Sequence, residues 1–323
     1  MKVMLHQRGR RIDTDDLRKS FPEVDWVEVD GPEGAAADIA DTDVLCLNTL
    51  AYNADLAKVV MGSAKKLKWI HFTTSGIDGA IHAGGFPAGV TVTNSAGLRA
   101  PNLTDHAFGM LLFMARNFRR LEEARREKYW ARDDLWEKII GLDGLTMTIF
   151  GMGAIGQVAA RKAKAFNMKV LGISRTYKPD HLVDSVFPRE RAKEAFAAAD
   201  AVLIAVPSEP DTRGFVNAEV FNVMKKTAFL VNVSRGDIIN EADLIAALKA
   251  GAIAGAGIDV MVKEPMPPEN ELWSLDNAFI APHVGGAGTH SDEPMLRIFA
   301  ENLRLFLDSQ PLRNLVDWPT MMG

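Results

Sequence analysis

The sequence predicts an α/β protein built from two doubly wound parallel-sheet domains, on three observations. The chain has 323 residues, and a domain typically spans roughly 100–200 residues, so two domains are expected. Short apolar runs alternate with helical patterns along the chain, which is typical of parallel sheets covered by helices on both faces. A glycine-rich turn at Gly151 opens the second of the two sections.

Four short apolar runs in the first section predict buried strands, at residues 3–5, 44–47, 69–72 and 90–92. Turn residues bound each run, and residues 53–60 carry a helical pattern between two of them. A long helical pattern begins after Pro101, with apolar residues at helical spacing to residue 118 and charged residues to about 128. We interpret it as one long helix that bridges the domains or packs against a second subunit.

The second section predicts about six strands, at residues 146–150, 169–173, 201–206, 228–233, 255–260 and 278–281. A helix is expected at residues 158–166 and helical segments separate most of the strands, as in a doubly wound sheet. Residues 296–307 carry the pattern of a final amphipathic helix.

Composition narrows the classes of partner. The formal net charge of -5 argues against nucleic acid as the main partner, and no window of about 18 apolar residues predicts a membrane span. The single cysteine, Cys46, lies in an apolar run, so it predicts a buried thiol with no disulfide and no thiolate metal site. We therefore expect no metal. We also expect a cytoplasmic protein, because the N-terminus lacks a signal-peptide pattern.

A G-x-G-x-x-G match begins at Gly151, directly after a predicted strand and at the start of a helix. That context is typical of a dinucleotide-binding turn. Gly151 permits the tight turn, Gly153 lets a pyrophosphate approach the backbone, and Gly156 lets helix and strand pack closely. The helix N-terminus offers N–H groups to the phosphates. We therefore assign Gly151, Gly153, Ala154, Ile155 and Gly156 to cofactor binding.

The next predicted strand ends in Ser174, Arg175 and Thr176. An acidic residue roughly 20 residues after the glycine turn would hold the ribose 2′-OH of NAD, but none stands there. Hydroxyl groups and a guanidinium attract a 2′-phosphate instead. The prediction is that NADP(H) is preferred, with NAD(H) as the alternative cofactor. The other interpretation is a surface loop that carries an arginine.

Three polar residues follow predicted strands of the second section: Arg235, Glu264 and His283. Ligands of open α/β sheets bind at the carboxyl ends of strands. Reduction of a 2-keto acid needs a proton donor that titrates near neutrality, a part that His283 suits. A neighbouring carboxylate, Glu264, would favour its charged form, and Arg235 would bind the substrate carboxylate through its planar fork. Taken singly, each residue has an ordinary alternative: a surface charge, a turn cap and a core histidine.

Together these residues resemble the D-isomer-specific 2-hydroxyacid dehydrogenase family. The resemblance rests on Asn232-Val233-Ser234-Arg235-Gly236, on Ile258-Asp259-Val260 with Glu264-Pro265, and on Pro282-His283, in the right order after the glycine turn. It covers nearly the whole chain. The compact length, the NADP pattern and the stretch from Glu264 to Glu269 resemble bacterial NADPH-dependent glyoxylate/hydroxypyruvate reductases within the family. The commoner NAD pattern is absent at Ser174-Arg175.

The resemblance implies further roles and a domain layout. Arg235, Glu264 and His283 would be catalytic, Val206, Pro207, Val233 and Asp259 would contact the cofactor, and the N–H groups of Ser75 and Gly76 would bind the substrate together with Arg235 and His283. A flavodoxin-like substrate domain, residues 1–100 and 289–323, would carry a Rossmann-type cofactor domain, residues 101–288, as an insertion. A homodimer is implied, with the helix after Pro101 and the loop of Trp130 and Trp136 at its interface.

Three functions stay open at this point. The first is NADPH-linked reduction of a small 2-keto acid resembling glyoxylate or hydroxypyruvate. The second is a corepressor-like binding protein that senses the nicotinamide cofactor, since those relatives retain the catalytic trio. The third is a dehydrogenase for a bulkier 2-hydroxy acid. Leu50 and Tyr52 follow a predicted strand, and either contact the substrate side chain or pack in the core.

Overall fold

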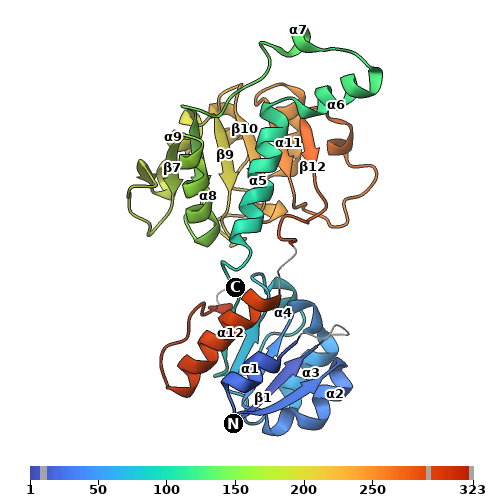
Figure 1. Cartoon of the computed structure of the whole chain (residues 1–323), viewed down its shortest axis with the longest axis vertical. Coiled ribbons are helices and arrows are strands. Elements are labelled where there is room, and N and C mark those ends of the chain that lie inside the picture. Colours follow the sequence, from blue (N-terminus) through green and yellow to red (C-terminus); the bar gives the residue numbers. More distant parts are fainter. Residues whose placement is uncertain (8–12, 289–291, 320–323) are drawn as a thin grey trace. The chain divides into compact units, whose positions relative to one another are not determined.

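The computed structural model describes residues 1–7, 13–288 and 292–319, and the chain divides into two compact units (Figure 1). Unit 1 comprises Met1–Leu98 and Gly288–Gly323, and unit 2 comprises Arg99–Ala287. The boundary expected between residues 288 and 289 falls at the edge of a stretch, 289–291, that lies outside the described residues.

Unit 1 is built on a parallel sheet of five strands in the order β2-β1-β3-β4-β5, which is the flavodoxin-like order. Its strands are β1 (Lys2–His6), β2 (Asp25–Val29), β3 (Val44–Leu47), β4 (Trp69–Phe72) and β5 (Thr91–Asn94). Its helices are α1 (Asp15–Ser20), α2 (Gly31–Asp38), α3 (Ala54–Ser63), α4 (Asp78–His82) and α12 (Asp292–Leu307), with short 3-10 turns at η1 (Ile39–Asp41) and η2 (Thr49–Ala51).

The core of unit 1 lies on both faces of this sheet, because the central strands are buried along their length. Trp69 of β4 stacks on Phe299 of α12 with ring centroids 5.4 Å apart. The C-terminal segment returns to the sheet, where the N–H of Val316 donates to the carbonyl of Val92 at 2.9 Å. Cys46 is buried as expected, and burial raises the pKa of its thiol. Unit 2 is thus inserted between β5 and α12.

Unit 2 has a parallel sheet of seven strands in the order β12-β11-β10-β9-β6-β7-β8. The strands are β6 (Thr146–Phe150), β7 (Lys169–Ile173), β8 (Ser185–Phe187), β9 (Ala201–Ile204), β10 (Phe229–Asn232), β11 (Gly255–Ile258) and β12 (Ala278–Ile280). The order reverses between β6 and β9, which is the switch point where dinucleotides bind in Rossmann-type sheets. The predicted fold class is confirmed in both units.

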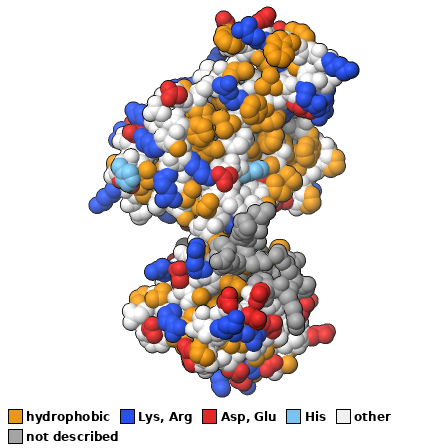
Figure 2. All heavy atoms as spheres, in the orientation of Figure 1, with side chains coloured by type: hydrophobic (Ala, Val, Ile, Leu, Met, Phe, Trp, Pro, Cys, Tyr) orange, Lys and Arg blue, Asp and Glu red, His pale blue; other side chains and the backbone are white. Residues whose placement is uncertain are grey.

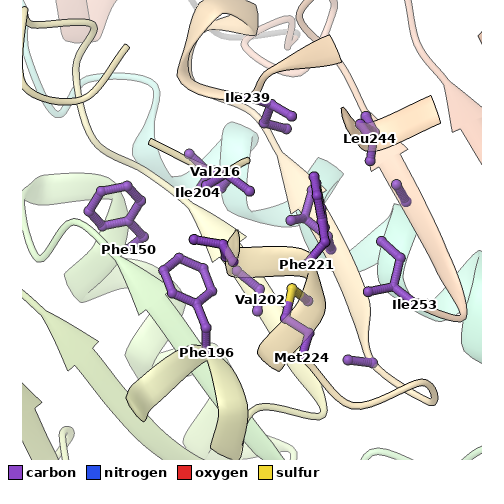
Figure 3. Close-up of a cluster of buried hydrophobic side chains, with 14 of the residues drawn as sticks. Phe150, Phe196, Val202, Ile204, Val216, Phe221, Met224, Ile239, Leu244 and Ile253 are labelled. Atoms are coloured by element: carbon purple, nitrogen blue, oxygen red, sulfur yellow. The ribbon is translucent and has the colours of Figure 1, made fainter. Parts of the chain in front are cut away.

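Helices cover both faces of the seven-stranded sheet. The helices of unit 2 are α5 (Ala100–Ala115), α6 (Phe118–Glu127), α7 (Arg132–Leu135), α8 (Ala154–Ala165), α9 (Ala192–Ala198), α10 (Ala218–Val223) and α11 (Glu241–Lys249), with 3-10 turns η3 (Arg189–Arg191), η4 (Gly236–Ile238) and η5 (Glu271–Ser274). Of these, α6 and α7 extend beyond the sheet (Figure 1), and their buried residues Ala124 and Leu135 belong to a separate small cluster. Buried residues of α5 and α8 form one core cluster with the sheet. Those of α9, α10 and α11 form the other, in which Phe196 and Phe221 are completely or almost completely buried (Figure 3).

The prediction of one long helix after Pro101 is wrong. The helix stops at Ala115, and Asn117 adopts a left-handed backbone with φ of 54° before α6 begins. Asparagine tolerates this conformation better than most residues and so can separate two helices. Two strands, β2 and β8, were not predicted. Each lies at the edge of its sheet and is only partly buried, so neither has the apolar run by which the inner strands were found.

No helix within the described ranges is both long enough and apolar enough to cross a membrane.

Candidate active site

The glycine turn after β6 is shaped by close backbone contacts. Gly151 has a φ of 106°, and a Cβ there would lie 2.7 Å from the backbone carbon and oxygen of Ala205. At Gly156, a Cβ would lie 2.0 Å from the carbonyl oxygen of Gly151. Side chains at these two positions would therefore drive apart β6, β9 and α8, so both glycines are required by the protein's own packing.

Gly153 differs from both, because a Cβ built on it would have no protein atom within 4 Å. It is the N-cap residue of α8, and the N–H groups of Ala154, Ile155 and Gly156 form the first turn, where no intrahelical acceptor exists. Open space in front of free N–H groups fits a pyrophosphate. The glycine turn thus offers the cradle that a dinucleotide needs.

The segment after β9 lies directly beside this turn. The Cγ1 of Val206 would be 2.8 Å from a Cβ at Gly151, and Val206 is buried whereas Pro207 is exposed. Both residues are therefore at the switch point of the sheet. Val233, at the end of β10, is 3% exposed and belongs to the core cluster, so its side chain contributes packing there.

Two carboxylates that are distant in the sequence lie beside Arg175, just after the end of β7. Arg175 lies 3.2 Å from Glu209 (Nη2 to Oε2) and 3.7 Å from Asp211 (Nη1 to Oδ2). Arg189 also pairs with Asp211, so two guanidinium groups face two carboxylates. The sequence reasoning found no acid here because it considered only the residues next to Arg175; the two carboxylates come from the loop after β9.

The hydroxyl groups flanking Arg175 are placed differently. The Oγ of Ser174 accepts hydrogen bonds from the backbone N–H groups of Thr176 (3.3 Å) and Tyr177 (3.1 Å), which shapes the loop. Thr176 is exposed. Ser174 is thus a turn-forming residue whose hydroxyl hydrogen is still available to a ligand.

Arg235 lies in the loop after β10, where its backbone carbonyl accepts a hydrogen bond from Asn232 Nδ2 at 2.8 Å. The next residue, Gly236, brings this loop against the loop after β11, because a Cβ on Gly236 would lie 2.1 Å from the backbone carbon of Met261. The N–H of Met261 donates to Glu264 Oε1 at 2.9 Å. Backbone contact therefore joins the loops that carry Arg235 and Glu264.

Glu264 and His283 form the closest titratable pair of the site. His283 Nδ1 lies 2.7 Å from Glu264 Oε2, with the two side chains 51% and 38% exposed. This is the distance of a charge-assisted hydrogen bond. The bond favours a proton on Nδ1 and orients the ring, so that Nε2 is left to exchange a proton with a ligand. The pairing expected from the sequence is present.

Asp259 anchors the backbone of the His283 loop. Its carboxylate is completely buried, and it accepts hydrogen bonds from the N–H groups of Val284 and Gly285, each at 2.9 Å. Its backbone carbonyl accepts from the N–H of His283 at 2.8 Å. His106 Nε2 lies 3.3 Å from Asp259 Oδ1. Sequence reasoning missed His106, which stands among the polar residues of a helix and follows no strand.

The loop with Ser75 and Gly76 belongs to unit 1, where it follows β4. Asn94 Nδ2 donates to the Ser75 carbonyl at 2.6 Å, and Thr49 Oγ1 donates to the Gly76 carbonyl at 2.8 Å. Within the described part of the chain, the N–H groups of Ser75 and Gly76 donate to no acceptor, so they can receive an anion. Tyr52 is buried and donates to the Gly85 carbonyl at 2.8 Å, which settles it as a core residue.

Comparisons with known proteins agree with this geometry. A family model described as "D-isomer specific 2-hydroxyacid dehydrogenase, NAD binding domain" matches residues 108–285. Glyoxylate reductase from Pyrococcus furiosus is 39% identical over 223 residues, covering 68% of this chain and 66% of the relative. Glyoxylate reductase from Thermococcus litoralis is 34% identical over 265 residues, covering 80% of each protein. A solved D-isomer specific 2-hydroxyacid dehydrogenase from Xanthobacter autotrophicus, in complex with NADPH and MES, is 25% identical, with a TM-score of 0.81 over 98% of each chain.

Proposed function

The chain belongs to the D-isomer-specific 2-hydroxyacid dehydrogenase family, and from that premise we propose that it reduces a small 2-keto acid, such as glyoxylate or hydroxypyruvate, with NADPH. The observation that carries the proposal is the 2.7 Å pair of His283 and Glu264 on the same unit as the glycine turn. The glyoxylate reductases among its relatives support the substrate class.

Different residues of this chain have separate roles in the proposed reduction. The bound nicotinamide supplies the hydride that goes to the carbonyl carbon. His283 donates its Nε2 proton to the carbonyl oxygen, and Glu264 stabilises the imidazolium that precedes this transfer. Arg235 binds the substrate carboxylate and polarises the adjacent carbonyl through its planar fork. In unit 1, we assign the N–H groups of Ser75 and Gly76 to binding of an anionic group of the substrate, because they have no acceptor within the described chain.

NADPH is the proposed cofactor, with NADH as the alternative. Arg175 supports it, as does the NADPH in the Xanthobacter autotrophicus relative. The ion pairs from Arg175 to Glu209 and Asp211 work against it, since a 2′-phosphate must compete with both carboxylates. Exposed ion pairs are worth about 0–1 kcal/mol, so the competition weakens NADPH binding without abolishing it.

Two substitutions test the cofactor assignment. Arg175→Ala should raise the KM for NADPH and leave that for NADH nearly unchanged. Glu209→Gln should lower the KM for NADPH by up to about fivefold, because it removes one competing ion pair. Glu219→Gln is a matched control, since Glu219 is another exposed acid paired with a cation. Equal effects of Arg175→Ala on both cofactors would contradict the role of Arg175.

We also propose a homodimer, formed by a second copy that covers the segment from α6 to α7 in unit 2. This segment exposes large apolar side chains: Phe118, Leu121, Tyr129, Trp130 (85% exposed) and Trp136 (69%). Figure 2 shows further hydrophobic side chains over and around α5, the helix that leads into it. Exposed apolar surface of this kind marks an interaction site. Sedimentation of Trp130→Ser should show a shift toward monomer.

The first experiment is the initial rate of NADPH oxidation, and separately of NADH oxidation, with glyoxylate, hydroxypyruvate and larger 2-keto acids. NADPH-linked turnover of glyoxylate or hydroxypyruvate is the expected result. Turnover confined to larger keto acids would move the substrate to a bulkier class. Tight cofactor binding without turnover of any keto acid would overturn the proposal in favour of a cofactor-sensing binding protein.

A further inference from the structure

His106 of α5 touches the buried carboxylate on which the loop of His283 depends. Its Nε2 lies 3.3 Å from Asp259 Oδ1, and the atom is itself buried with no hydrogen-bond partner among the described residues. Asp259, at ion-pair distance, is therefore the acceptor that the structure offers it. A buried carboxylate needs such partners, because an unpaired charge in the interior costs several kcal/mol.

The same imidazole ring also packs on the loop itself. A Cβ built on Gly285 would lie 2.6 Å from Asp259 Oδ2 and 3.0 Å from His106 Cδ2. Gly285 is thus enclosed between the carboxylate and the ring, and any shift of His106 changes the space in which the loop lies. His106 thus lies close to both the Asp259 carboxylate and this loop.

Asp259 holds the backbone of the loop that carries His283. Its carboxylate accepts hydrogen bonds from the N–H groups of Val284 and Gly285, and its backbone carbonyl accepts one from the N–H of His283. His283 has a φ of 55°, a left-handed conformation that is unfavourable for a residue other than glycine and that persists only when its surroundings enforce it. The three hydrogen bonds to Asp259 supply that enforcement.

We propose that His106 is a positioning residue of the hydride-transfer site, which fixes the Asp259 carboxylate and, through the N–H groups of Val284 and Gly285, the loop that carries His283. This inference rests on the proposed function. In this role His106 presents its Nε2 to Asp259 Oδ1, which lies 3.3 Å away. Its contribution is the orientation of His283 toward the substrate carbonyl.

The test compares two substitutions of His106 that separate the donor from the ring. Leucine fills a similar volume but donates nothing, whereas glutamine places an amide N–H near the position of Nε2. Displacement of a catalytic group by about 1 Å can cost about a hundredfold in rate. We expect His106→Leu to displace His283 by less than that and to lower kcat by about tenfold. His106→Gln should recover most of that loss. His181→Gln, at an exposed histidine of the same unit, is the matched control and should keep the wild-type rate.

A second measurement reads the hydrogen bonds without any turnover. The amides of Val284 and Gly285 donate to the Asp259 carboxylate, so His106→Leu should speed their hydrogen exchange by about tenfold, while the amides of β9 should keep their protection. The slow exchange should return in His106→Gln. This readout does not use substrate. If only the proposed function is wrong, the wild type will show no turnover of keto acids, but His106→Leu will still speed the exchange of these amides.

Two results would overturn the inference. One is a His106→Leu variant with a wild-type kcat and wild-type exchange at Val284 and Gly285. The other is a His106→Gln variant that loses as much as His106→Leu, which would reduce His106 to a packing role. A double-substitution cycle with Asp259→Asn adds a third criterion: the effects on kcat should be strongly non-additive if both act on one unit, and additive effects would count against coupling.

Discussion

Replacing Gly153 by alanine separates binding of the pyrophosphate from folding. A Cβ on Gly153 would have no protein atom within 4 Å, and the residue has a φ of -73°, which suits any L-amino acid. Two small effects on the free energy of unfolding oppose each other. Loss of chain entropy in the unfolded state stabilises by about 0.4–1 kcal/mol, and alanine is a poorer N-cap residue than glycine. We expect the thermal midpoint to stay within about 3 °C of wild type.

The cofactor should respond very differently. The added methyl group projects about 1.5 Å from the Cα into the space before the first turn of α8, so a phosphate oxygen held by the N–H groups there must withdraw by about 1 Å. One charge-assisted hydrogen bond contributes about 1.5–3 kcal/mol, and each 1.4 kcal/mol is tenfold in affinity. The Kd for NADPH should therefore rise by about 10-fold to 100-fold, with a similar rise for NADH, because both carry the pyrophosphate.

The assay is an equilibrium titration of each cofactor, followed by nicotinamide fluorescence, beside a thermal melt of each variant. Gly109→Ala in α5 is the control, since a Cβ there also meets no protein atom within 4 Å and no phosphate is expected near it. Gly156→Ala is the opposite case, because its Cβ would lie 2.0 Å from the Gly151 carbonyl oxygen and should destabilise the fold. An unchanged Kd in a folded Gly153→Ala variant would refute the placement of the pyrophosphate.

Three further substitutions or conditions test other parts of the structure. Gly236→Ala would place a Cβ 2.1 Å from the backbone carbon of Met261. The loops after β10 and β11 would have to separate by about 1.3 Å to restore ordinary contact, so kcat/KM for the keto acid should fall by about a hundredfold. Wild-type kinetics would contradict the coupling of these two loops. Arg235→Lys should lower kcat/KM by about a hundredfold with little change in the cofactor Kd, because the bidentate fork is lost; near-normal turnover would remove Arg235 from carboxylate binding. Burial lowers the pKa of His71 from 6.5 to about 3. Between these two pH values the unfolded chain binds a proton at His71 and the folded chain does not. The free energy of unfolding should therefore fall as the pH drops from about 6.5 toward 3, by at most about 5 kcal/mol. Denaturant titrations of wild type and His71→Gln across this range check the last prediction, since the variant should lose that part of the pH dependence.

The inner strands and the glycine turn could be predicted from the sequence because their signals are local. A buried parallel strand is an uninterrupted apolar run, such as Val44–Leu47, and its neighbours in the sheet do not change that signal. Edge strands carry no such run: β2 exposes Asp25 and Glu28 and was therefore not predicted. The break at Asn117 was missed for a related reason, since apolar and charged residues continue at helical spacing across a single left-handed residue.

Partners that come from distant loops could not be predicted. Arg175 stands without an acid in its own loop, and the carboxylates that pair with it are 34 and 36 residues further along the chain, at 209 and 211. His106 and Asp259 are separated by most of unit 2, on a helix and at a strand end. Only the arrangement of the sheet brings such groups together, so the sequence could not show that Arg175 has acidic partners.

The hydrogen-bond ladder of the sheet continues beyond its strands toward the loops that carry Arg235, Glu264 and His283. After β10 and β11 end, the N–H of Asp259 still donates to the Asn232 carbonyl at 3.0 Å, and the N–H of His283 donates to the Asp259 carbonyl at 2.8 Å. The residues just past three neighbouring strands thus remain in register with one another. The ladder joins Asn232, Asp259 and His283, and Arg235 and Glu264 follow the first two of these residues in the chain. Asp259 lies in the middle of this ladder, so the backbone position of His283 depends on a residue outside the predicted trio of Arg235, Glu264 and His283.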